Sequence, residues 1–124
     1  MKTEIRYIEL KTGYSDNGPA WIGKVKVSRT GTTVYFNDKA FKRCIGISGN
    51  YRDAETGDEY WISGVKKDGT ERHWAGNGKI GLQRAIVAEY LKLTGQSAID
   101  PNRIEIVDIP EAYSIDRINK LENS

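Results

Sequence analysis

Apolar and polar residues alternate most clearly over residues 20–37, AWIGKVKVSRTGTTVYFN. A period of two indicates strands that bury one face, and Thr30-Gly31 between the two runs suits a two-residue turn. With that turn, the cross-strand pairs would be Val25–Phe36, Lys26–Tyr35 and Val27–Val34. The pattern therefore predicts a β-hairpin with one apolar face, and a solvent-facing side that carries Lys24, Lys26, Tyr35 and Asn37.

Further strand signals extend this β-rich region over residues 4–75. Residues 4–11 alternate with a partly apolar face on either side, and residues 40–45 can return as a strand after a tight turn. Asp68-Gly69 is a typical hairpin turn within residues 59–75, and it predicts that Trp61 and Trp74 share a face beneath the helix. Residues 46–58 are rich in glycine and polar side chains, so we expect the longest loop of the chain there.

The hydrophobic period changes after residue 81. Apolar residues then recur at helical spacing, which predicts a helix over residues 82–94, and Gly95 is placed to end it. Residues 103–107 read as a short strand. A capping-box pattern beginning at Asp108, with Pro110 in the first turn, predicts a second helix over residues 109–121.

Together these elements predict an α+β fold in a single domain, residues 1–124. We expect a small, strongly bent antiparallel β-sheet, with an SH3-like barrel as its proposed form, packed against one main helix. A second, C-terminal helix would be the last element of this fold. An open, highly twisted sheet is the alternative to the barrel. A chain of 124 residues can bury such a core without disulfides or metal.

Cysteine, histidine and acidic residues exclude several kinds of site. Cys44 and His73 are the only residues of their types, so no internal disulfide can form and most zinc sites are excluded. Every Cys-His or Ser-His-Asp scheme that does not use His73 itself is excluded as well. The acidic cluster around Gly57 lacks the ligand spacing of a calcium loop, which favours a solvated turn. A glycine pattern over residues 76–81 follows a hairpin instead of a parallel βαβ unit, which argues against a dinucleotide site. We therefore expect no metal, cofactor or catalytic residue.

The charge is weakly positive and unevenly distributed. The formal net charge is +2, and residues 1–84 hold 15 Lys and Arg against 10 Asp and Glu, whereas residues 85–124 hold 4 against 7. This excess permits binding to phosphate or to an acidic protein, but it is below that of dedicated nucleic-acid binders. No apolar run is long enough to span a bilayer, and the first residues lack the pattern of a signal peptide, so we expect a cytoplasmic protein with no membrane association.

Aromatic and basic residues interleave across the β-rich region. Small β-barrels bind single strands with such sets, because rings stack on bases and cations neutralise phosphates. Trp21 has the parity of the buried valines and is expected at the edge of the core, and a solvated Lys26–Tyr35 pair is an alternative to a binding role. The ligand-binding candidates are Lys24, Lys26, Tyr35, Tyr51, Arg52 and Arg72.

Three runs carry a family resemblance: GYSDNGPAWIGKVKVSRTGTTVYFN, GISGNYRD and EYWISGVKKDGTERHW. Over most of residues 5–95 the chain resembles a set of small bacterial proteins without an established activity, some of which carry an automatic label of 1-deoxy-D-xylulose-5-phosphate synthase. A thiamine-diphosphate synthase is several times longer and has separate domains for the cofactor's pyrophosphate and pyrimidine. No motif here matches those domains, so the resemblance implies no catalytic residue.

These observations favour a non-enzymatic binding module whose ligand is nucleic acid or an acidic protein partner. The expected surface combines the polar face near Lys24, Lys26 and Tyr35 with the loop at residues 46–58. The alternative is a small enzyme with its site in that glycine-rich loop. The sequence does not predict the oligomeric state.

Overall fold

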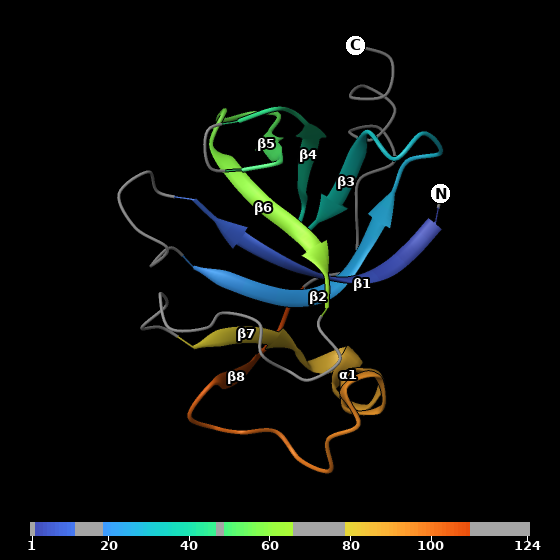
Figure 1. The fold of residues 1–124 in the computed structure, drawn as a ribbon, viewed down its shortest axis with the longest axis vertical. Helices are drawn as coiled ribbons and strands as arrows, with labels where there is room; N and C mark the ends of the chain where they lie inside the picture. Colours follow the sequence, from blue (N-terminus) through green and yellow to red (C-terminus); the bar gives the residue numbers. More distant parts are fainter. Residues whose placement is uncertain (1, 12–18, 47–48, 66–78, 110–124) are drawn as a thin grey trace.

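A computed structural model describes residues 2–11, 19–46, 49–65 and 79–109. Figure 1 shows the arrangement of these elements. The strands and helices, in chain order, are β1 Lys2–Leu10, β2 Ala20–Val27, β3 Thr33–Phe36, β4 Lys39–Arg43, β5 Tyr51–Asp53, β6 Glu59–Gly64, β7 Ile80–Gln83, the 3₁₀ helix η1 Arg84–Ile86, α1 Val87–Thr94 and β8 Ile104–Val107.

Six antiparallel strands form a closed barrel. Their order is β1-β6-β5-β4-β3-β2, and β1 also pairs with β2, which closes the barrel. The predicted small antiparallel barrel is confirmed, and its closure excludes the open-sheet alternative. The SH3-like form stays a prediction, and the second helix at 109–121 lies, apart from Ile109, outside the described residues.

Strands β7 and β8 extend the barrel sheet as a parallel arm. β7 pairs with the first half of β2, and β8 pairs with β7. In Figure 1 the arm and α1 lie on the side of β1 and β2 that faces away from the barrel. The second half of β2 pairs with β3, so one edge of β2 is divided between two neighbours.

Alternation along the shared strands gives the molecule two apolar clusters. On β1, Ile8 faces the barrel interior and Tyr7 faces the arm, as the two partly apolar faces of this strand predict. The interior cluster consists of Ile8, Val25, Val34, Phe36, Phe41, Tyr60 and Ile62. The outer cluster consists of Tyr7, Ala20, Ile22, Ile80, Leu82, Ile86, Tyr90 and Ile104.

The central hairpin has the predicted register. Lys26 lies opposite Tyr35 and Val27 lies opposite Val34. Trp21 is partly buried against the interior cluster, as its parity predicts. However, the predicted solvent exposure of Tyr35 is wrong, because this side chain is only 1% exposed. All four residues of β3 are buried, so both faces of this strand are covered.

Three other expectations need correction. The helix begins at Val87, because Leu82 belongs to β7, where pairing with β2 and β8 leaves every residue buried. Trp61 is 42% exposed on the outer face of β6 and does not pack beneath the helix. The predicted loop at 46–58 contains strand β5. Gly95 does end the helix in a left-handed conformation, with φ 69°, as predicted.

Gly23 gives a first testable prediction about the barrel. A Cβ at this position would overlap the ring of Phe36 and lie 3.1 Å from Gln83 Oε1. We expect Gly23→Ala to lower the free energy of unfolding by about 1–3 kcal/mol, since overpacking forces buried neighbours to move. Urea unfolding measures this. Gly64→Ala is the matched control, because a Cβ there meets no atom within 4 Å. Equal stability of the two variants would contradict the prediction.

Candidate ligand-binding pocket at the barrel mouth

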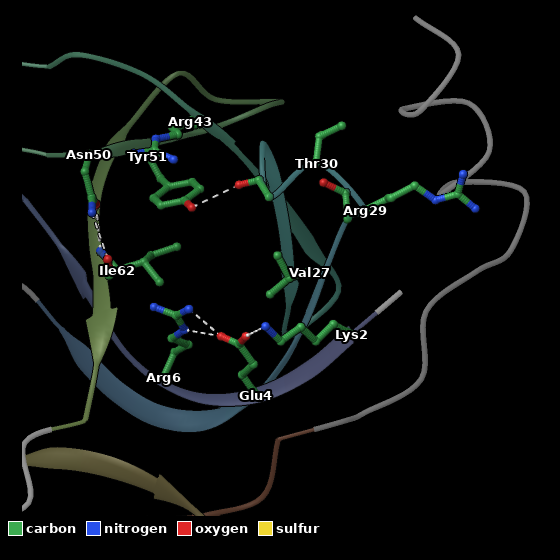
Figure 2. Close-up of a pocket in the computed structure, with 12 residues that line it drawn as sticks. Lys2, Glu4, Arg6, Val27, Arg29, Thr30, Arg43, Asn50, Tyr51 and Ile62 are labelled. Atoms are coloured by element: carbon green, nitrogen blue, oxygen red, sulfur yellow. Dashed lines mark hydrogen bonds and ion pairs between the residues drawn. The ribbon is translucent and has the colours of Figure 1, made fainter.

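One end of the barrel opens into a polar pocket of about 440 Å³. This volume is within the range of about 300–1,000 Å³ for small-ligand sites. Figure 2 shows the pocket, and we call this site the mouth pocket. It is lined by Lys2, Glu4, Arg6, Val27, Ser28, Arg29, Thr30, Gly31, Arg43, Asn50, Tyr51 and Ile62.

Strand β1 supplies three charged side chains to the mouth pocket. Alternate residues of a strand share a face, and Ile8 on the inward face is fully buried in the interior cluster. Arg6, Glu4 and Lys2 follow on that same face as β1 leaves the packed core. Arg6 lies opposite Gly64 of β6, so the neighbouring strand places no side chain at the paired position.

Glu4 holds the two cations beside it. Its Oε1 lies 2.9 Å from Lys2 Nζ, and its Oε2 accepts a hydrogen bond of 2.7 Å from Arg6 Nε. Figure 2 shows Glu4 between these two cations. The hydrogen bond from Lys2 and the adjacent Arg6 lower the pKa of Glu4 below its usual value, although burial acts in the opposite direction. Glu4 is therefore a fixed negative charge inside the pocket at neutral pH.

Arg43 and Tyr51 form the opposite wall. They are directly paired residues of β4 and β5. The Tyr51 hydroxyl donates to the carbonyl of Gly31 over 3.3 Å, which orients the ring against the turn between β2 and β3. Arg43 is exposed and makes no ion pair with a carboxylate of the described residues.

Asn50 fixes the rim next to Tyr51. Its Nδ2 donates to the carbonyl of Ile62 over 2.8 Å, and its Oδ1 accepts from the Ile62 backbone N–H over 2.8 Å. The amide thus reproduces the hydrogen bonds of a paired strand residue. Because Ile62 belongs to the interior cluster, these two hydrogen bonds connect the rim to the packed core.

The mouth pocket is cationic. Among the described residues, Lys2, Arg6, Arg29 and Arg43 line it together with a single carboxylate, that of Glu4. The resulting local charge of about +3 concentrates much of the excess positive charge of residues 1–84 in one concave site. Concave cationic sites attract anions more strongly than flat surfaces do, because low-dielectric walls focus the field.

Of the five predicted ligand-binding residues that the structure describes, Tyr51 alone lines this pocket. Arg52 follows it on β5 and is exposed, but it does not line the pocket. Lys24 and Lys26 are partly buried on the outward face of β2, away from the inward-facing Val25. Tyr35 is buried, and Arg72 lies outside the described residues.

Sequence reasoning missed Arg6 and Arg43 as pocket residues. Both have the parity of a core residue on the same strand, Ile8 on β1 and Phe41 on β4. A charged residue that continues the inward face of a strand is the signal that could have identified this end of the barrel.

The acidic cluster near Gly57 has a structural role. Asp53 is 4% exposed, and its Oδ1 accepts from the backbone N–H groups of Glu55 and Thr56 over 2.8 and 3.3 Å. Gly57 completes this turn with φ 80°. In the described part of the chain, no group of three or more His, Cys, Asp and Glu side chains could hold a metal ion.

Glu59, next to the glycine-rich loop, has one buried carboxylate oxygen, Oε1, without a hydrogen-bond partner among the described residues. This oxygen occupies the space that a side chain at Gly46 would fill. A side chain at position 46 would therefore displace the Glu59 carboxylate, and the contact assigns no chemistry to the loop.

No helix in the described part of the chain is both long and apolar enough to cross a membrane. Comparison with known proteins does not identify a relative: no protein-family model, no curated protein and no solved structure matches this chain.

Proposed function

We propose that the protein is a non-enzymatic binding module for single-stranded nucleic acid, with the mouth pocket as its site. The observation that carries this proposal is the pairing of a fixed aromatic ring, Tyr51, with the cations of a concave pocket. Single-strand binders combine these two features, because rings stack on bases and cations neutralise the backbone phosphates. The ligand class agrees with the sequence-based hypothesis, whereas the site moves from the Lys24–Tyr35 face to the barrel mouth.

The shape of the site favours nucleic acid over an acidic protein partner. A hollow of about 440 Å³ fits a compact group such as a nucleotide. Protein interfaces of standard size instead bury about 800 Å² on each partner, which is far more than one small hollow provides. An acidic protein partner is the second outcome of the test below.

Fluorescence anisotropy of labelled single-stranded RNA and DNA oligomers tests the proposal. We expect saturable binding that weakens between about 50 and 200 mM salt, because bound phosphates release counterions. Arg43→Glu should weaken binding by about tenfold or more, since the charge of a pocket residue is reversed. Arg103→Glu is the matched control: it makes the same change at an exposed position in the turn before β8, outside the pocket.

Two results would count against the proposal. Absence of binding at about 100 µM protein and low salt, the weak end of non-specific affinities, would refute a nucleic-acid module. Equal losses in Arg43→Glu and Arg103→Glu would show that overall charge, and not the mouth pocket, governs binding. Displacement of the oligomer by poly-aspartate as effectively as by unlabelled RNA would favour an acidic protein partner.

Other sequence-based expectations stay proposals. They are the SH3-like form of the barrel, the second helix at 109–121, a cytoplasmic location and, as the alternative function, a small enzyme with its site at residues 46–58. In the described part of that segment, the Asp53 carboxylate already accepts two backbone N–H groups, so no observation favours the enzyme.

A further inference from the structure

The mouth pocket is closed at its base. Val27 and Ile62 line it, and Ile62 is 4% exposed within the interior cluster. Ile8 and Val25 of the same cluster are fully buried, so packed side chains fill the barrel beyond the pocket. A continuous nucleic-acid strand cannot pass through such a site. The pocket can take only a group that projects into it from solvent, such as the end of a nucleic-acid strand.

Glu4 already occupies the place of an anion in this pocket. Its carboxylate lies 2.9 Å from Lys2 Nζ and accepts from Arg6 Nε over 2.7 Å. An incoming phosphodiester carries one negative charge, as Glu4 does. Replacing the Glu4 carboxylate by a phosphodiester therefore adds no negative charge beside Lys2 and Arg6. A phosphate monoester carries about −1.5 to −2 at neutral pH, so the same exchange is electrostatically favourable.

The opposite wall provides the remaining contacts. Figure 2 shows Tyr51 and Arg43 across the pocket from Arg6 and Glu4. A phosphate near Arg6 and Lys2 can therefore carry a base that stacks on Tyr51 on the opposite wall, beside the exposed cation of Arg43.

We propose that the mouth pocket recognises a terminal phosphate monoester attached to a nucleotide, and that this group displaces Glu4 from Lys2 and Arg6. The inference rests on the proposed function and specifies which part of the nucleic acid enters the site. Two sources share this chemistry, namely the phosphorylated end of a single strand and a free mononucleotide.

The test compares short oligouridylates that differ only at one end. In the first pair, each oligomer carries fluorescein at its 3′ end and either a phosphate or a hydroxyl at its 5′ end. In the second pair the ends are exchanged, so that fluorescein is at the 5′ end and the phosphate or hydroxyl is at the 3′ end. We expect the phosphorylated member of at least one pair to bind wild-type protein about tenfold more tightly. Equal affinity within both pairs would overturn the inference and leave the proposed function intact. Failure of every oligomer to bind would instead refute the proposed function.

Uridine monophosphate then distinguishes the two sources. Displacement of the phosphorylated oligomer by uridine monophosphate at a similar concentration would identify a free mononucleotide as a sufficient ligand. Displacement only at much higher concentration would support a strand end, because neighbouring nucleotides then contribute to binding.

Glu4→Gln tests the exchange itself. Without the internal carboxylate, neither strand has to displace an anion from Lys2 and Arg6, so we expect both affinities to rise several-fold. The phosphorylated strand carries the larger negative charge, so its affinity should rise at least as much and the preference for phosphate should persist. Glu105→Gln makes the same change at an exposed position of β8 and should leave both affinities unchanged. Unchanged affinities in Glu4→Gln would overturn the role assigned to Glu4.

Discussion

Glu9→Ala is expected to lower the free energy of unfolding by about 3–5 kcal/mol, because it breaks a buried ion pair. Glu9 is 5% exposed on the outward face of β1. Its Oε2 lies 2.8 Å from Lys11 Nζ, and its Oε1 accepts from the hydroxyl of Tyr7. The Lys11 side chain is 15% exposed. Alanine therefore removes a carboxylate from an ammonium group that water solvates poorly.

Urea unfolding of a short variant series separates charge from packing at Glu9. Glu9→Gln keeps an acceptor for Tyr7 and should cost less than Glu9→Ala. The double variant Glu9→Met/Lys11→Met removes both charges, and we expect it to be more stable than Glu9→Ala. Glu105→Ala, at an exposed position, should change stability by no more than about 0.5 kcal/mol. A loss below about 1 kcal/mol in Glu9→Ala would show that the pair is not needed for stability.

The sequence predicted those features that alternation and local turns determine. The register of the central hairpin follows from Val25 and Val27 on one strand and Val34 and Phe36 on the next, since any slip would mix apolar and polar faces. The two faces of β1 were identified in the same way. Gly95 was placed correctly because a left-handed residue after a helix favours glycine.

The incorrect predictions concern residues whose surroundings come from distant parts of the chain. Leu82 fits helical spacing, yet strand pairing with β2, some 60 residues earlier, places it in β7. Trp61 is exposed although the large apolar surface of its side chain favours burial. Tyr35 is buried although alternation with the core residues Val34 and Phe36 places it on the opposite face of the strand. Local pattern shows which residues share a face, but it does not show which outward faces the remaining chain covers.

The candidate site illustrates the same limit. Tyr51 was selected because it is an aromatic residue beside Arg52 in a polar segment, and it does line the mouth pocket. Arg6 and Arg43 were not selected, although their parity places them on inward faces. Whether an inward-facing charge is buried or reaches solvent depends on where the barrel ends. That position is set by the pairing of β1 with both β2 and β6, which no local pattern shows.

Gln83→Met is expected to lower the free energy of unfolding by about 2–4 kcal/mol, because it removes at least two hydrogen bonds at a junction of strands. On one edge of β2, β7 pairs with Trp21 and Ile22, and β3 pairs with Lys26 and Val27. Lys24 lies between these two segments, and its backbone N–H donates to Gln83 Oε1 over 2.8 Å.

Gln83 also binds the chain that follows β8. Its Nε2 donates to the carbonyl of Ile109 over 3.3 Å, and the residue is 1% exposed. Methionine keeps nearly the same volume, so any loss of stability comes mainly from the groups left without the amide, those of Lys24 and Ile109 among them. Urea unfolding measures the loss, with Gln96→Met at an exposed position as the matched control. Equal stability of the two variants would show that water or a rearranged strand accepts the hydrogen bond from the Lys24 backbone N–H. The barrel and its parallel arm would then be joined by apolar packing and the pairing of β2 with β7, and not by this amide.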